Sequence, residues 1–311
     1  MRRAKLRRKG MSEMRVLVTG GGGFLGSHIC DELTLRGASV VVLDLVHSPW
    51  LSEGQEMVVA DVADTESLDR AMRGCDAVFH CAAVADLDAA RADPRKAIEI
   101  NVLGTLSVLE SAAEAGVSRF VHASSVYVLS RSGSVYRTSK MAAENVVQDI
   151  AGQFPLAPTI LRFGSLYGPR ADPGNAILRM VRQAVLEGRI DFWGDGSEVR
   201  EYIHIRDAAA LAVDSVAGQY AGQTLHIAGR ERLSTIELLE TINEMLGGGL
   251  EITLQDRSFE GRYHLTPYSF ESTLGRRIVG NTYVDLGLGV LETIRLISES
   301  DFSSNHGVES P

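Results

Sequence analysis

The chain contains few cysteines. Of its 311 residues only three are cysteine, Cys30, Cys75 and Cys81, and no two of them form a CxxC pair. Three cysteines leave at least one unpaired in any disulfide scheme, so a disulfide framework is excluded and we expect a reduced, cytoplasmic protein. No His, Cys and carboxylate residues share the spacing of a metal site, so we expect no bound metal.

Basic residues are in the minority. The sequence has 31 Lys and Arg against 40 Asp and Glu, which gives a net charge of -9. An acidic surface repels a phosphate backbone, so we expect no nucleic-acid partner. Any anionic ligand would have to be held locally, by helix N-termini or by single arginines.

Long apolar runs are absent as well. No segment approaches the roughly 20 apolar residues that cross a bilayer, so we expect no association with a membrane. Basic residues dominate residues 1–13, but the apolar core of a signal peptide does not follow them, and we expect a disordered leader there. The polar, aperiodic residues 298–311 are expected to form a disordered tail.

Between these ends, short runs rich in β-branched residues alternate with stretches of helical periodicity. The short runs predict strands at 15–20, 39–44, 56–61, 76–81, 119–124 and 157–163. The periodic stretches predict helices at 24–36, 65–73, 94–116 and 137–152. This alternation predicts an α/β fold, a Rossmann-type doubly wound parallel sheet with helices on both faces.

The segment TGGGGFLGSH joins the first predicted strand to the first predicted helix. Gly20 permits a tight turn, Gly23 lets the backbone approach a pyrophosphate, and Gly26 lets the helix pack closely on the strand. A flexible turn is the alternative for a glycine motif alone, but the strand before it and the helix after it indicate a dinucleotide-binding loop. We expect Phe24 and Leu25 to border the cofactor.

Acidic residues end the next two predicted strands. Asp44 lies eighteen residues beyond Gly26, where a carboxylate accepts hydrogen bonds from the adenosine ribose and repels a 2′-phosphate, which favours NAD over NADP. Asp61 ends the third strand and could bond the adenine amino group or cap the following turn, and both possibilities stay open. Val62, beside it, is expected to border the cofactor.

The regular alternation weakens after about residue 170. Helical candidates at 174–188, 206–217 and 234–246 are mixed with strands and loops. We therefore predict an NAD-binding domain at 14–170, to which residues 200–228 return. A smaller C-terminal substrate-binding lobe is predicted at 171–297.

Taken together, the motifs resemble those of the extended short-chain dehydrogenase/reductases, which include nucleotide-sugar epimerases, dehydratases and decarboxylases. The match runs from about residue 14 to at least 290 and includes TGGGGFLG, HCAA, NVLGT, YRTSK, LRFGSLYGPR and GDGSEVREYIHIRD. The resemblance implies an NAD-binding Rossmann domain and a small domain that closes over a nucleotide-linked sugar, with a UDP-sugar expected first. It also implies a homodimer formed through the long helices at 94–116 and 137–152.

Tyr136 and Lys140 are the expected chemical centre. They lie four residues apart on a predicted helix, so both side chains share one face. The ammonium would favour a phenolate, which could act as general base toward a sugar hydroxyl oriented by Ser125. A solvated helix face is the alternative for an isolated pair of this kind. Tyr127, in a turn-rich context, is expected to be a bystander.

The resemblance assigns the remaining site residues. Arg200 matches the arginine that reaches the diphosphate of a nucleotide sugar, with a surface ion pair as its alternative, and Arg262 could be a second phosphate contact. Asn101 matches an asparagine near the active-site strands, and its alternative is a polar residue inside a helix. Tyr136 and Lys140 are also expected to contact the cofactor, with Lys140 on the nicotinamide ribose. The other expected cofactor contacts are Phe163 and the small residues Ala82 and Ala83, for which plain core packing is the alternative, and Ser165 is an expected substrate contact.

The sequence departs from the family pattern in three places. Ser165 replaces an asparagine that commonly contacts substrate. Only ten residues separate Ser125 from Tyr136, so the pocket wall is expected to be more open or to be completed by another segment. Val126 and Tyr127 stand where dehydratases carry Asp-Glu, which disfavours dehydration.

The leading hypothesis is therefore an NAD-dependent nucleotide-sugar epimerase that oxidises a sugar hydroxyl transiently and returns the hydride to the opposite face. The alternative is an NAD-dependent dehydrogenase, reductase or decarboxylase of a related sugar. A non-catalytic NAD-binding regulatory protein is a third possibility, which the intact Tyr-Lys pair disfavours.

Overall fold

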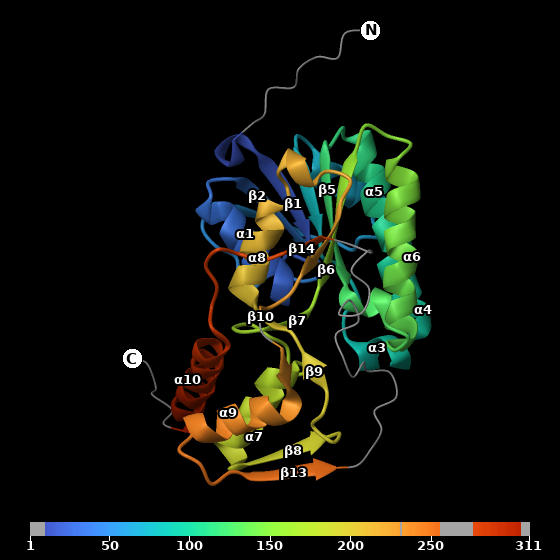
Figure 1. Ribbon diagram of the computed structural model, residues 1–311. Helices are drawn as coiled ribbons and strands as arrows, with labels where there is room; N and C mark the ends of the chain where they lie inside the picture. Colours follow the sequence, from blue (N-terminus) through green and yellow to red (C-terminus); the bar gives the residue numbers. More distant parts are fainter. Residues whose placement is uncertain (1–9, 231, 256–275, 306–311) are drawn as a thin grey trace.

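A parallel eight-stranded sheet forms the centre of the larger domain (Figure 1). The computed structural model describes residues 10–230, 232–255 and 276–305. The strand order is β14-β11-β6-β5-β4-β1-β2-β3. The bounds are β1 (Arg15–Thr19), β2 (Ser39–Asp44), β3 (Gln55–Val59), β4 (Ala77–His80), β5 (Arg119–Ser125), β6 (Ala157–Phe163), β11 (Thr224–Ile227) and β14 (Arg276–Ile278). The order reverses between β1 and β4, and such a point is where open α/β sheets bind ligands.

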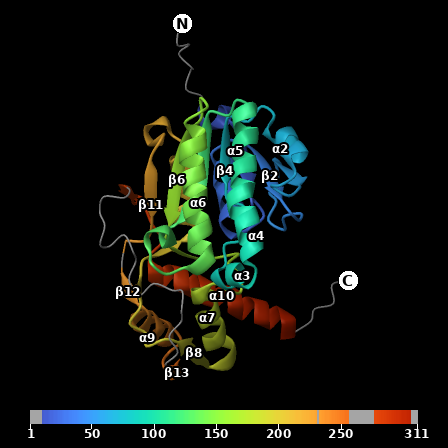
Figure 2. The same ribbon diagram turned by 90° about the vertical axis from the view of Figure 1, so that its right-hand side faces the viewer.

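Helices cover both faces of this sheet (Figure 1), and Figure 2 turns one of these faces toward the viewer. On one face lie α1 (Phe24–Leu35) and α8 (Ile205–Asp214), and on the other lie α2 (Thr65–Met72), α5 (Thr105–Glu114) and α6 (Ser134–Ala151). Valine and leucine side chains alternate between two buried cores, because each strand is covered on both faces. The predicted doubly wound α/β fold is confirmed.

The helix expected at 94–116 forms as three consecutive elements. These are α4 (Pro94–Ile98), a π-helical segment η2 (Glu99–Gly104) and α5, and α3 (Leu87–Ala92) precedes them. A Cβ at Gly104 would lie 2.8 Å from Val62 Cγ2, so the segment packs closely on the loop after β3. The widened π turn places Asn101 in the interior.

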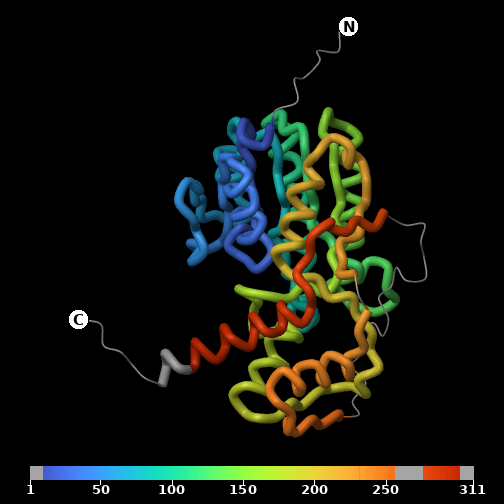
Figure 3. Tube along the Cα trace, turned by 60° about the vertical axis from the view of Figure 1, so that its left-hand side comes forward, coloured from blue at the N-terminus to red at the C-terminus, as the bar shows by residue number. Residues whose placement is uncertain are grey.

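The smaller lobe is built around helices α7 (Ala176–Glu187), α9 (Thr235–Met245) and α10 (Leu286–Asn305), whose apolar faces form a separate core (Figure 3). Three two-stranded pairs accompany them. The pairs are β7 (Ser165–Tyr167) with β10 (Tyr202–His204), β8 (Arg189–Trp193) with β13 (Glu251–Gln255), and β9 (Val199–Arg200) with β12 (Leu233–Ser234). Between these lobe segments, α8 and β11 return to the large domain.

The ends of the chain differ from the sequence-based expectation. Met11–Glu13, inside the expected disordered leader, form a 3-10 turn because Met11 packs against the core of the large domain. The helix α10 continues past residue 298, into the expected disordered tail, because its buried Ile294 and Ile297 anchor it to the lobe. Helix propagation then costs little per residue, whatever the polarity of the sequence.

The strand β14 also differs from expectation, since its residues fall in the range 171–297 assigned to the lobe. It pairs in parallel with β11 at the edge of the large sheet. A three-residue strand is too short to show an alternation of apolar and polar residues, so its position is set by pairing with the free edge of β11 and cannot be predicted from its own sequence.

Within the part of the chain that the structure describes, no helix has the length and apolar character needed to cross a bilayer.

Candidate active site

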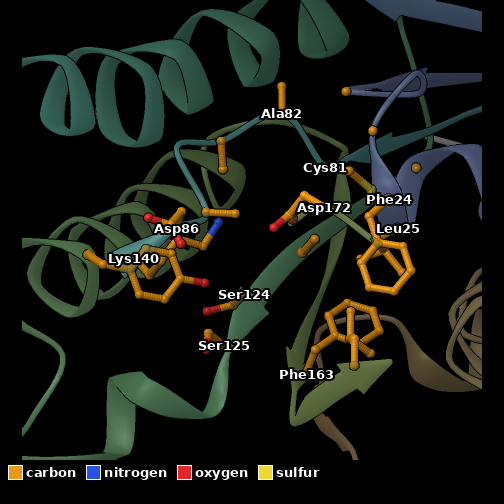
Figure 4. Close-up of a pocket in the computed structure, with 18 of the residues that line it drawn as sticks. Phe24, Leu25, Cys81, Ala82, Asp86, Ser124, Ser125, Lys140, Phe163 and Asp172 are labelled. Carbon is orange, nitrogen blue, oxygen red and sulfur yellow. The ribbon is translucent and has the colours of Figure 1, made fainter. Parts of the chain in front are cut away.

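A cavity of about 570 Å³ lies at the carboxyl ends of the central strands, between the large domain and the lobe. One part of its wall comes from the loop after β1 and the ends of β2, β4 and β5, and another part from β7, β9 and α7 of the lobe. Figure 4 shows Lys140 and Ser125 on one side and Phe24, Leu25 and Phe163 on the other. This is the position that the topology predicts for a ligand site.

The loop after β1 has room only for glycine at two positions. Gly20 has φ +67°, and a Cβ there would lie 2.6 Å from the Ala82 backbone nitrogen. A Cβ at Gly26 would lie 2.1 Å from the Gly20 carbonyl oxygen. The N-cap of α1 is Gly23, so the positive end of this helix faces the cavity beside Phe24 and Leu25. These features fit the pyrophosphate of a dinucleotide.

The two acidic residues expected to contact the cofactor both line the cavity. Asp44 accepts hydrogen bonds from the backbone N–H of Gly22 at 2.9 Å and of Leu45 at 2.7 Å. A carboxylate has about four acceptor positions, so the fixed Asp44 can still accept from ribose hydroxyls. Asp61 accepts a hydrogen bond from Ala63 N–H at 2.9 Å, so its carboxylate stabilises the following turn. The same residue also lines the cavity, so a contact with the adenine stays possible. Val62 lies beside it in the wall.

Ser125, Tyr136 and Lys140 are brought together in the same cavity. Ser125 ends β5, while Tyr136 and Lys140 lie one turn apart on α6 and are 9% and 4% exposed. Burial of the ammonium lowers the pKa of Lys140 from 10.5 to about 8, against the opposing effects of Cys81 and Glu144. A cation near a phenol favours the phenolate, so this geometry can support proton transfer.

Tyr127 also borders the cavity, and its expected role as a bystander in the chemistry stays a prediction. Ser125 caps the 3-10 turn η3 (Val126–Leu129), and this turn brings Tyr127 into the cavity wall. The rings of Tyr127 and Tyr136 meet edge to face, with centroids 6.0 Å apart. A Cβ at Gly133, where φ is +114°, would lie 2.8 Å from Tyr127 Cδ1. The short segment between β5 and α6 therefore contributes Tyr127 to the cavity wall. Gly133 is the residue in the sequence that could have indicated this close packing.

Asn101 does not line the cavity, contrary to the expected cofactor contact. Its Oδ1 accepts from Val84 N–H at 2.7 Å, and its Nδ2 donates to Val84 O at 3.1 Å and to Ser139 Oγ at 2.9 Å. The side chain is fully buried and committed to these partners. It joins the loop after β4 to α6, and the alternative of a structural polar residue inside a helix is the one observed.

The other expected contacts divide into two groups. Ala82 and Phe163 line the cavity near the glycine loop, and Ser165 and Arg200 line it on the lobe side. Ala83 also belongs to the wall. The expected second phosphate contact, Arg262, lies outside the described residues.

Two aspartates in the wall were missed by the sequence reasoning. Asp86 caps α3 by accepting from Ala89 N–H at 2.7 Å, and Asp172 accepts from Gly174 N–H at 2.9 Å. A Cβ at Gly174 would lie 3.0 Å from Asp172 Oδ1 and 3.1 Å from Asp86 Oδ2, so the two carboxylates are neighbours. Both residues look like ordinary capping or turn residues in the sequence, and only the fold brings them together (Figure 4).

The chain is similar to known proteins in both sequence and fold. Residues 16–227 match the model of the NAD dependent epimerase/dehydratase family. A UDP-glucose 4-epimerase from Mycolicibacterium smegmatis is 31% identical over 260 residues, which cover 75% of this chain and 83% of that protein. A UDP-N-acetyl-alpha-D-glucosaminuronate decarboxylase from Bacillus cytotoxicus is 26% identical over 290 residues, covering 85% and 88%.

A solved structure gives the same result for the fold. A dTDP-glucose 4,6-dehydratase from Streptomyces venezuelae with NAD bound superposes with a TM-score of 0.79 and 31% identity, over 93% of this chain and 98% of that one. Its cofactor agrees with the glycine loop and Asp44 described above. The relatives include epimerases, dehydratases and decarboxylases of nucleotide sugars, and the chain is an NAD-dependent enzyme that belongs to the NAD-dependent epimerase/dehydratase family.

Proposed function

We propose that the protein is a nucleotide-sugar epimerase that uses NAD, with a UDP-sugar as its preferred substrate. The observation that carries the proposal is the meeting of Ser125, Tyr136 and Lys140 in one cavity with a dinucleotide loop, without a carboxylate directly after Ser125. Val126 is buried and Tyr127 packs on Tyr136, so the two positions that hold Asp-Glu in dehydratases hold no carboxyl group for removing water.

The proposed chemistry assigns one role to each residue. Ser125 holds a sugar hydroxyl, and Tyr136 takes its proton while Lys140 stabilises the phenolate. When bound, NAD would supply the hydride acceptor for the carbon that bears this hydroxyl, and its reduced form would supply the hydride that returns. The keto sugar must turn over between the two transfers, and the cavity of about 570 Å³ gives it space. Tyr136 then returns the proton to the inverted hydroxyl.

The acidic pair favours epimerisation over decarboxylation. A decarboxylase must hold a sugar carboxylate next to the reacting carbons, but Asp86 and Asp172 would repel such a group. The described cations of the wall are Lys140, next to the catalytic tyrosine, and Arg200 on the lobe. We assign Arg200 to the diphosphate, since a guanidinium matches phosphate oxygens, and the sugar itself is then expected to be uncharged or amino-substituted.

The assembly and location follow from the surface and the cysteines. We propose a homodimer through the outer surface of α4, η2, α5 and α6, because Ile98 at the end of α4 is 38% exposed and Leu103 on η2 is 55% exposed. We also propose a cytoplasmic location, since Cys30, Cys75 and Cys81 are all free thiols.

A panel of UDP-, GDP-, CDP- and dTDP-sugars tests the activity. The purified protein is incubated with each sugar, and both cofactor reduction and product stereochemistry are followed. We expect a stereochemically inverted product from a UDP-sugar without net reduction of the cofactor. Stoichiometric reduction would indicate a dehydrogenase instead, and release of carbon dioxide from a uronic acid would indicate a decarboxylase.

A further inference from the structure

A buried charge network lies directly behind the Tyr136–Lys140 pair. Glu144 Oε1 accepts from Ser124 Oγ at 2.6 Å and from Arg162 Nε at 2.9 Å, and Glu144 Oε2 accepts from Arg162 Nη2 at 2.7 Å. Glu144 is 4% exposed and Ser124 is 5% exposed. A bidentate pair of this geometry, with a third donor to the same carboxylate, is among the stronger polar contacts that a protein interior holds.

The network joins the elements that carry the proposed chemistry. Ser124 directly precedes Ser125 on β5, Arg162 directly precedes Phe163 on β6, and Ser124 lies opposite Arg162 in the sheet register. Glu144 lies one helical turn after Lys140 on α6. A movement of α6 relative to β5 and β6 would therefore break three hydrogen bonds of one carboxylate, so the network fixes the distance between the serine and the Tyr-Lys pair.

The network also places a negative charge near Lys140. Four titratable groups interact with this ammonium: Glu144 on α6, His80 on β4, Cys81 directly after β4, and His122 on β5. Burial lowers the pKa of His80 to about 3, lowers the pKa of His122 well below its usual value, and raises the pKa of Cys81 to about 12. At neutral pH these three are uncharged, which leaves Glu144 as the described anion that acts on Lys140.

We propose that Glu144 is a positioning residue for the Tyr136–Lys140 pair: it anchors their helix to the strand of Ser125 and supplies the negative charge that faces Lys140. The proposal rests on the catalytic roles given above to Ser125, Tyr136 and Lys140. Glu144 touches neither substrate nor cofactor in this assignment, since it is not part of the cavity wall.

Four variants of the full chain separate this role from a merely structural one. Glu144→Gln removes the charge, Arg162→Met breaks the same pair but keeps the charge, and the double variant removes both partners. Asp149→Asn is the matched control, because it makes the same change of charge at an exposed position of α6. In each background with NAD bound, the near-ultraviolet absorbance of tyrosinate is titrated with pH, and the same titration with Tyr136→Phe is subtracted.

We expect Glu144→Gln and the double variant to move the Tyr136 midpoint to higher pH, by about threefold or more in the ionisation constant, because Lys140 then loses its proton earlier. Arg162→Met should leave the midpoint in place or lower it, and Asp149→Asn should not move it. The double variant should unfold at a higher temperature than either single variant, because no buried charge is left alone.

A wild-type midpoint in the double variant would overturn the proposal, because the role of Glu144 would then be structural. The titration needs no sugar, so it stays independent of the proposed activity. A wild-type protein that converts no nucleotide sugar would contradict the proposed function, whereas an unshifted midpoint contradicts only the role of Glu144.

Discussion

At the residue scale, the two tyrosines of the cavity differ in what their hydroxyls do. Tyr136 lies one turn from Lys140 and is the proposed base, while Tyr127 contributes the edge of its ring to the wall. Removing the Tyr136 hydroxyl should therefore remove chemistry, and removing the Tyr127 hydroxyl should leave the packing intact.

We expect Tyr136→Phe to lower turnover by a factor of about 10²–10⁴, the usual size of a general acid-base contribution. NAD affinity, measured by calorimetry, should stay close to that of the wild type. The matched variant Tyr127→Phe should lose less than about tenfold. Comparable losses in both variants would mean that the base is not Tyr136.

Because the pKa of Lys140 is lowered, we expect a rise in pH to affect activity and stability in opposite directions. Its ammonium is present below a pKa of about 8, so turnover should fall as the pH rises through about 8. The folded-state pKa is lower than the unfolded value of 10.5, so the unfolded chain binds more protons between these values and stability should rise with pH from about 8 to 10.5.

Lys140→Met should accordingly abolish turnover and stabilise the cofactor-free protein at pH 7, by up to about 3 kcal/mol. Thermal unfolding measured between pH 7 and 10 checks this. A variant that is less stable than the wild type over this range would show that hydrogen bonds of Lys140 outweigh its burial.

At the element scale, we propose that the loop between β1 and α1 holds the pyrophosphate of the cofactor through its backbone. We expect Gly20→Ala to abolish NAD binding, since the new Cβ would meet the Ala82 backbone and φ is +67°. Gly54→Ala is the control: φ is +85°, but nothing lies within 4 Å, so it should cost only about 1–2 kcal/mol of stability. Equal NAD affinity in both variants would contradict the assignment of this loop.

The short connection between β5 and α6 is the second element with a testable role. Gly133→Ala would place a Cβ against Tyr127 and should push this ring toward Tyr136. We expect turnover to fall at least about tenfold with unchanged NAD affinity, because the changed contact lies on the substrate side. Steady-state kinetics and calorimetry on the same preparation measure both quantities, and a parallel loss of NAD affinity would argue against a local effect.

Elements with a clear period could be predicted from the sequence, and those set by neighbours could not. The strands and helices of the NAD-binding domain agree within a few residues, because buried β-branched runs and amphipathic helices carry their own signal. The strand β14 depends on β11, and the length of α10 depends on its anchor in the lobe. The predicted cofactor contact of Asn101 was wrong because its partner Val84 is distant in sequence. A family resemblance cannot show which side chains have all their hydrogen bonds within the protein.

At the scale of the whole molecule, the proposed dimer makes a simple prediction. Leu103→Glu should shift the mass measured by light scattering from dimer to monomer, because it puts a charge on the outer surface of η2 and α5. Leu35→Glu, at a position 81% exposed on α1, is the control and should leave the mass unchanged. A monomeric wild type would remove the basis for this interface.

We propose that both domains together hold the sugar, between the NAD loop and the lobe, while it is transiently oxidised. The most direct measurement uses the UDP-sugar that the panel identifies, deuterated at all ring carbons, with mass and stereochemistry of the product determined together. We expect an inverted product that keeps its full deuterium content, because the same hydride leaves and returns. Loss of deuterium to solvent at the inverted carbon, or inversion by Tyr136→Phe at the wild-type rate, would contradict it.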